Sequence, residues 1–155
     1  MIPTDPAMEN KLATEPIEYK EGFKYQLTKP HTFYLPIQPG GWGDGAKYKN
    51  CGPFITVYRD GRVDLAVGYS WDGASGPTID DETNQVPGLE HDASYQLMRN
   101  DILSRDPFRK LVDIQFRDGC LARGMNWFRA QYFYLGVRKG GQSAATDKRK
   151  VCTAP

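Results

Sequence analysis

The chain has 155 residues, of which 39% are hydrophobic and 25% are charged. This length allows one domain with a substantial core but not two large domains. Because 20 Lys and Arg nearly balance 19 Asp and Glu, the composition argues against nucleic acid as a partner. No apolar run approaches the ~18–20 residues of a membrane span, and the start of the chain does not resemble a signal peptide. Three widely spaced cysteines, Cys51, Cys120 and Cys152, favour free thiols in a reducing compartment.

The two ends of the chain differ from its middle. Residues 1–18 hold three prolines without apolar periodicity, which indicates an extended arm. Residues 138–155 are rich in Gly, Ser and Ala and carry a net charge of +4, so we expect a flexible basic tail over 141–155. A single domain is expected between them, over residues 19–140. The arm and the tail are either solvated or ordered by docking on other subunits of an assembly.

The first half of the central region predicts strands. Residues 22–37 and 53–69 are rich in β-branched and aromatic residues and are punctuated by Pro and Gly. The second segment predicts a hairpin, because Gly61 accepts the positive φ that a tight turn requires. Residues 38–53 are glycine-rich but lack the residue order of a phosphate-binding loop, so we expect a plain loop there.

A first helix is predicted to open at Pro87. Its apolar stripe recurs every four residues, at Leu89, Ala93 and Leu97. At ~100° per residue, a second stripe on roughly the opposite face consists of His91, Tyr95 and Met98. We expect this second face to be exposed or to line a cleft.

Two further helices follow. One is predicted to begin at Asp106-Pro107 and to stop near Gly124. The other runs from Asn126 to about Val137, is aromatic on nearly every side, and should be substantially buried or lie in an interface. Strands followed by helices predict an α+β domain, with an antiparallel hairpin or small sheet and then three helices.

His91 is the leading candidate for chemistry. A histidine that acts as a general base needs an acceptor that fixes its tautomer and stabilises its charged form. If the first two helices pack antiparallel, Asp113 on the second faces His91. The alternative is that Asp113 pairs with Arg109 or Arg117 on its own helix. The other histidine, His31, has no acidic neighbour in the sequence and is expected at the surface.

Asp72 and Ser75 lie in a loop of small residues directly after the predicted hairpin. No cofactor is expected, unless a divalent cation takes oxygen ligands from this loop and from a carboxylate such as Asp92. Ser75 has no evident base or oxyanion hole, so fixing the turn is the simpler role for both loop residues. We expect them near three converging helical side chains, those of His91, Tyr95 and Asp113.

Four motifs follow one another along residues 52–141: Trp71-Asp72-Gly73-Ala74-Ser75-x-Pro77, His91-Asp92-x-x-Tyr95, Val112-Asp113-x-x-Phe116 with Gly124, and Tyr134-x-x-Val137-Arg138-x-Gly140. This pattern resembles the phage and prophage family catalogued as domain of unknown function 1353. Since the biochemical activity of that family is not established, the resemblance implies the context of a tailed phage rather than a particular chemistry.

A weaker resemblance links the chain to phospholipase A2-like enzymes. There, an H-D-x-x-Y motif on one helix faces an aspartate on a second, antiparallel helix. The resemblance implies that His91 is the base for a water and that Asp113 orients it. It also implies that Tyr95 bonds to Asp113 and that Asp92 is a calcium ligand.

Two functions are therefore expected. The first is a virion-associated structural or accessory protein of a tailed phage, at the tail or its tip, made in the bacterial host cytoplasm. Its partners would be other phage structural proteins in an oligomeric assembly. The alternative is a small hydrolase that acts on lipid or cell-envelope material through His91 and Asp113. A nucleic-acid accessory has only the basic tail in its favour.

Overall fold

The computed structural model describes residues 19–20, 25–43, 45–73 and 80–146. These residues form two antiparallel sheets followed by three helices, which confirms the predicted α+β class and the order of strands before helices. The predicted arm, Ser75 and residues 147–155 of the predicted tail lie outside the described residues. Of the helices in the described ranges, none is long and apolar enough to cross a membrane.

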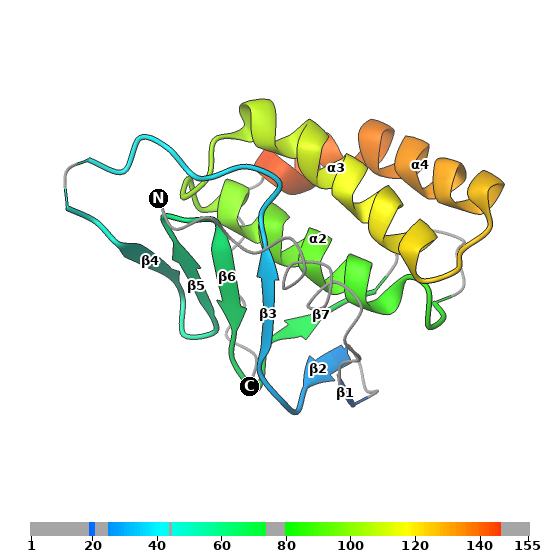
Figure 1. The fold of residues 1–155 in the computed structure, drawn as a ribbon, viewed down its shortest axis with the longest axis horizontal. Coiled ribbons are helices and arrows are strands. Elements are labelled where there is room, and N and C mark those ends of the chain that lie inside the picture. The colour runs from blue at the N-terminus through cyan, green and yellow to red at the C-terminus, as the bar shows by residue number, and fades with distance from the viewer. Residues whose placement is uncertain (1–18, 21–24, 44, 74–79, 147–155) are drawn as a thin grey trace.

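A four-stranded antiparallel sheet forms most of the β part (Figure 1). In spatial order, its strands are β3 (His31–Tyr34), β6 (Arg62–Leu65), β5 (Ile55–Tyr58) and β4 (Tyr48–Cys51). A smaller sheet has the order β1 (Tyr19–Lys20), β2 (Tyr25–Leu27) and β7 (Ser70–Trp71). Side chains alternate between the two faces of a strand, so the inward residues of neighbouring strands meet in the core. Val57 and Val63 are such a pair, and both are fully buried.

The predicted hairpin is confirmed as β5 and β6. Gly61 has a φ of 94° in the turn between them, a conformation that favours glycine. The Gly61 N–H donates to the carbonyl of Tyr58 at 3.0 Å, and Asp60 Oδ1 accepts a bond from the Arg62 N–H at 3.0 Å. The turn residues therefore fix the register of the two central strands.

The expectation of a plain loop over residues 38–53 is wrong at its end, where β4 pairs with β5. Strand β4 is at the edge of the sheet, and of its four residues only Cys51 is buried. An edge strand of this kind has no apolar alternation for sequence reasoning to detect. Its pairing depends on main-chain bonds and on the contact of Tyr48 with Tyr58, whose ring centroids are 6.0 Å apart.

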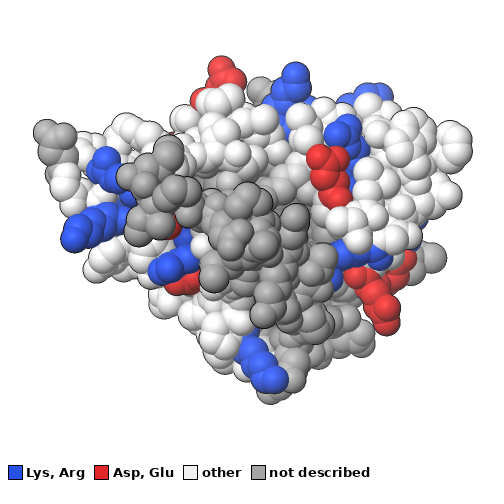
Figure 2. All heavy atoms as spheres, viewed as in Figure 1, with Lys and Arg blue, Asp and Glu red and all other residues white. Residues whose placement is uncertain are grey.

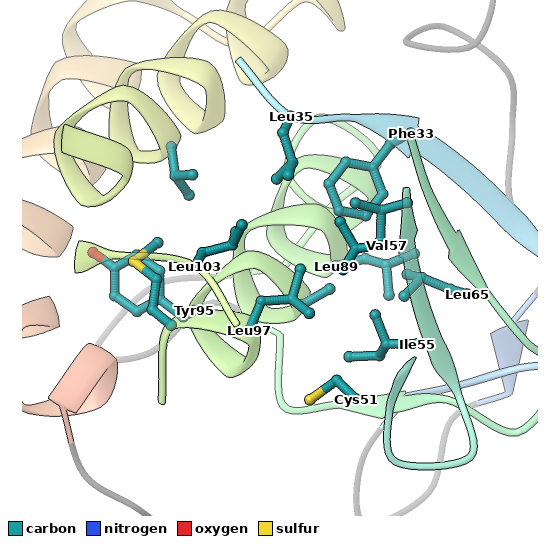
Figure 3. Close-up of a cluster of buried hydrophobic side chains, with 14 of the residues drawn as sticks. Phe33, Leu35, Cys51, Ile55, Val57, Leu65, Leu89, Tyr95, Leu97 and Leu103 are labelled. Atoms are coloured by element: carbon teal, nitrogen blue, oxygen red, sulfur yellow. The ribbon is translucent and has the colours of Figure 1, made fainter. Parts of the chain in front are cut away.

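Helix α2 (Gln85–Arg99) lies between the sheet and the other two helices, α3 (Arg105–Ala122) and α4 (Trp127–Thr146) (Figure 1). Leu89 and Leu97 point toward the sheet, which confirms the predicted apolar stripe (Figure 3). The opposite face is not exposed, because α3 and α4 pack against it. His91, Tyr95 and Met98 are consequently all buried.

Both ends of α3 agree with the sequence, whereas α2 begins at Gln85, two residues before the predicted Pro87. Regular helical backbone in α3 follows Asp106, whose φ and ψ are −104° and 126°, and Gly124 stands after the helix with a φ of 92°. Helix α4, however, continues to Thr146 instead of ending near Val137. Residues 141–146 of the predicted tail are thus helical, because tertiary packing of α4 against α2 and α3 outweighs the low helix propensity of its glycines.

A second, smaller core fills the space between α3 and α4 and consists of Phe116, Cys120, Met125, Ala130 and Phe133. The structure describes two of the three cysteines, Cys51 and Cys120, and both are buried free thiols. Burial raises the pKa of the Cys120 thiol to about 12, so this side chain is a packing group and not a nucleophile.

Candidate functional site

Helices α2 and α3 bring together the three side chains that were predicted to converge. His91 and Tyr95 lie one turn apart on α2, and Asp113 lies on α3. His91 Nε2 is 2.7 Å from Asp113 Oδ1, and the Tyr95 hydroxyl donates to the same oxygen at 2.6 Å. The spacing of four residues on a helix also places the rings of His91 and Tyr95 in contact, with centroids 4.2 Å apart.

Arg138 on α4 completes this cluster. Its Nη1 donates to Asp113 Oδ2 at 2.7 Å, so both oxygens of a carboxylate with no exposed side-chain surface are bonded. We call these four residues, His91, Tyr95, Asp113 and Arg138, the His91 network. It joins all three helices, because each helix contributes at least one member.

Sequence reasoning missed the arginine that pairs with Asp113. Arg109 instead donates to the main-chain carbonyls of Val137 and Arg138, and Arg117 bonds to the neighbouring Asp118. Both interactions differ from the predicted alternative of a pair along α3. Arg138 belongs to the fourth motif and begins the basic stretch, but it lies 25 positions from Asp113 and no local spacing pairs the two.

The charges of the His91 network follow from its contacts. Burial raises the pKa of the Asp113 carboxyl, but the bonds from His91, Tyr95 and Arg138 outweigh it and leave that pKa below its ordinary value. Burial and the bond to Asp113 hold the pKa of Tyr95 well above its ordinary range. Asp113 is therefore an ionised acceptor, and Tyr95 is a neutral donor.

The same contacts determine the state of His91. Burial lowers its pKa, whereas the contacts with Asp113 and then Asp92 raise it more, so the net pKa lies above 6.5. Because Asp113 is an ionised acceptor, the neutral imidazole carries its proton on Nε2 and a lone pair on Nδ1. Nδ1 lies 4.0 Å from Asp92 Oδ1, and 35% of the Asp92 side chain is exposed. The lone pair therefore lies on the more exposed side of the network.

Asp92 and Asp72, two of the predicted site residues, lie near the Nδ1 side of His91. Burial raises the pKa of Asp92, contact with His91 opposes this, and the charge of Asp72 adds to the rise, so the two carboxylates are electrostatic neighbours. In the described ranges, no three His, Cys, Asp or Glu side chains form a group that could hold a metal. The predicted cation site stays a prediction, because residues 74–79 of its loop lie outside the described residues. Ser75 lies outside the described residues.

Close packing surrounds the His91 network. The ring of Phe116 contacts that of His91 at a centroid distance of 5.0 Å, and Phe133 meets Phe116 edge-on. Gly141 on α4 is buried against Tyr95, and a Cβ atom added there would lie 2.5 Å from the Tyr95 hydroxyl oxygen. Only glycine lets α4 approach so closely. Because Gly141 is the first residue of the predicted flexible tail, the sequence does not predict this packing role.

The expectation that His31 is a surface residue is wrong. His31 is buried on β3, and its Nε2 lies 2.9 Å from Glu90 Oε1 on α2. The alternation of β3 places His31 on the same side as Phe33, which faces the core. Its acidic partner is 59 positions away, so no local pattern indicates the pair.

The fold and the site together define an α+β domain in which a charged His–Asp–Tyr–Arg network is buried between three helices. Comparisons with family models, curated proteins and solved structures find no match for this chain. The resemblances based on motifs therefore stay predictions.

Proposed function

We propose that the chain is a small hydrolase in which His91 is the general base and Asp113 is the residue that orients it. One observation carries the proposal: His91 Nε2 is bonded to a buried carboxylate with a lowered pKa. This bond leaves Nδ1 as the basic nitrogen, on the side where Asp92 reaches solvent. A base and an orienting acid within hydrogen-bond distance form the basic unit of hydrolytic sites.

In the proposed reaction, His91 Nδ1 accepts a proton from a water whose oxygen attacks the carbonyl carbon of an ester. The Asp113 carboxylate stabilises the imidazolium that forms, as carboxylates do in nucleophile–base triads. When the C–O bond to the leaving alcohol breaks, the imidazolium returns the proton to that alcohol. Tyr95 and Arg138 act as positioning residues, since they hold the carboxylate of Asp113 in place.

The substrate class that we propose is lipid or other cell-envelope material. It rests on the resemblance of the α2 and α3 motifs to the helix pair of phospholipase A2-like enzymes. The bond from Tyr95 to Asp113 and the contact of His91 Nε2 with Asp113 agree with the roles that this resemblance implies.

The decisive experiment replaces His91 with glutamine. The side-chain amide of glutamine can still donate a hydrogen bond to Asp113, but it has no basic nitrogen. We expect His91→Gln to lower the rate of hydrolysis by about 10²–10⁴-fold, the usual contribution of a general base. The measurement is release of fatty acid from phospholipid vesicles, and of soluble products from purified bacterial cell envelopes.

The matched control is His31→Gln, which changes the other buried histidine and its bond to Glu90. We expect this variant to retain its rate per folded molecule, as measured with circular dichroism on the same sample. Equal losses in both variants, or no hydrolysis by the unaltered chain with either substrate, would contradict the proposal.

A second candidate is the virion-associated role, at the tail or tail tip, with other phage structural proteins as partners. One feature of the structure favours it. Among the described residues, four of the seven large hydrophobic side chains that are exposed lie on α4: Trp127, Phe128, Tyr132 and Leu135. Such clustering is typical of protein contact surfaces. The two roles are compatible, because a particle component can carry an enzymatic site.

A further inference from the structure

The surface of α4 that faces away from α3 carries an apolar row. Phe128, Tyr132 and Leu135 are 77%, 59% and 55% exposed, and they are separated by four and then three residues. Exposed Lys139 continues the row after four more residues. This spacing keeps all four residues on one side of a helix and is the seam of a coiled coil. We call them the α4 seam. Few charged side chains lie over the start of α4 in Figure 2.

The seam is not needed for the fold of one chain. The inner side of α4 already packs through Ala130 and Phe133, which are buried against α3. Trp127, 56% exposed, adds to the apolar surface beside Phe128, with ring centroids 5.1 Å apart. Large aromatic residues are seldom left exposed in a cluster without a partner.

We propose that the α4 seam binds a second copy of this chain, with the two α4 helices antiparallel. Aromatic side chains bury about 150–250 Å² each when they are fully covered. At the exposed fractions of Trp127, Phe128, Tyr132 and Leu135, this gives roughly 400–500 Å² of apolar surface per copy. Two copies would bury at most about 800–1,000 Å² from these four residues, and the borders of the seam would add to this area toward an interface of ordinary size.

The distribution of charge favours the antiparallel direction. In a parallel pair, Lys139 of one copy would lie beside Lys139 of the other, and the like charges would repel. In an antiparallel pair with two-fold symmetry, Tyr132 meets Leu135 and Phe128 meets Lys139. The second contact places an ammonium group on an aromatic ring, which is attractive. Gly136, exposed beside the seam with nothing within 4 Å of an added Cβ, leaves room for close approach of the helices.

Sedimentation of the full chain tests the proposal. We expect a reversible dimer, and we expect Leu135→Glu to weaken its formation by about tenfold or more, since it buries a charge at the centre of the seam. The control is Val67→Glu, because Val67 is 52% exposed but lies outside α4. It should leave dimerisation unchanged. A chain that is monomeric at all concentrations, or a dimer that both variants weaken equally, would overturn the proposal.

Disulfide cross-linking tests the direction, in a Cys152→Ser background that removes one native thiol. The double variant Phe128→Cys, Lys139→Cys should cross-link between copies, whereas Lys139→Cys alone should not. The reason is that two Lys139 positions in the antiparallel pair are about 16 Å apart along the axis, at 1.5 Å per residue. Efficient cross-linking by Lys139→Cys alone would overturn the antiparallel assignment. A monomer that instead sediments with phospholipid vesicles would assign the seam to a membrane surface.

Discussion

Asp113 has no solvent-exposed side-chain surface and still keeps its negative charge. Burying a carboxylate is costly unless donors replace the lost water, and His91, Tyr95 and Arg138 supply those donors. Sequence spacing alone indicated two of the three, because His91 and Tyr95 share a helix face that a short connection turns toward α3. It did not indicate Arg138, whose position depends on how α4 packs.

The raised pKa of His91 has opposite effects on stability and on activity. Since the folded state favours the protonated imidazole, its contribution to stability is complete below pH 6.5 and is lost as the pH rises through the folded pKa. A general base must be neutral, so hydrolysis should increase over that same rise in pH. We expect an activity profile whose acid limb lies above pH 6.5.

The variant Arg138→Gln tests whether the His91 network determines the pH at which hydrolysis falls on the acid side. The variant keeps a donor for Asp113 but removes a positive charge near His91, so protonated His91 becomes more favourable and the limb moves to higher pH. Activity should fall on the order of a few-fold at mildly acidic pH and recover in alkaline buffer. The measurement is the pH dependence of kcat/KM. A loss of the same size at every pH would mean that Arg138 affects folding or substrate binding instead.

At the scale of secondary structure, local sequence signals predict the elements that depend on local conformation, but not the elements that depend on tertiary packing. The hairpin turn at Gly61 and the helix stop at Gly124 depend on backbone conformations that local sequence determines. Strand β4 and the last turns of α4 form because of partners distant in the chain, and their own residues are polar or rich in glycine. Helix α4 shows this most clearly, since its glycines lower helix propensity while one of them permits its packing.

Substitutions at two neighbouring glycines of α4 distinguish the effect of helix propensity from the effect of close packing. Gly141→Ala places a Cβ about 2.5 Å from the Tyr95 hydroxyl, and we expect it to lower the free energy of unfolding by roughly 1–3 kcal/mol. Gly140→Ala is the matched control, because nothing lies within 4 Å of its added Cβ. It should stabilise the chain by up to about 1 kcal/mol through helix propensity. Denaturant unfolding at one protein concentration measures both, and equal effects would contradict the close approach of α4 to Tyr95.

In the whole molecule, α4 is the element that contributes to the core, to the His91 network and to the exposed apolar surface. Its inner side closes the second core and supplies Arg138 to Asp113, while its outer side carries the α4 seam. The near-neutral net charge of the chain therefore does not reflect the basic stretch over residues 138–155, which begins within α4. Residues 138–146 belong to the domain, and the unassigned part of the predicted tail shortens to 147–155.

Truncation at two points distinguishes these parts. A chain that ends after Thr146 keeps every contact that joins described residues to one another, so we expect an unchanged unfolding midpoint and an unchanged rate of hydrolysis. A chain that ends after Val137 loses Arg138 and leaves Asp113 without its ion pair. Breaking a buried pair costs about 3–5 kcal/mol, so this shorter chain should be severely destabilised. If residues 147–155 dock on other subunits of a particle, the chain that ends after Thr146 should fail to enter particles although it remains folded and active. Normal incorporation of this variant into infectious particles would show that residues 147–155 are not needed for the virion-associated role.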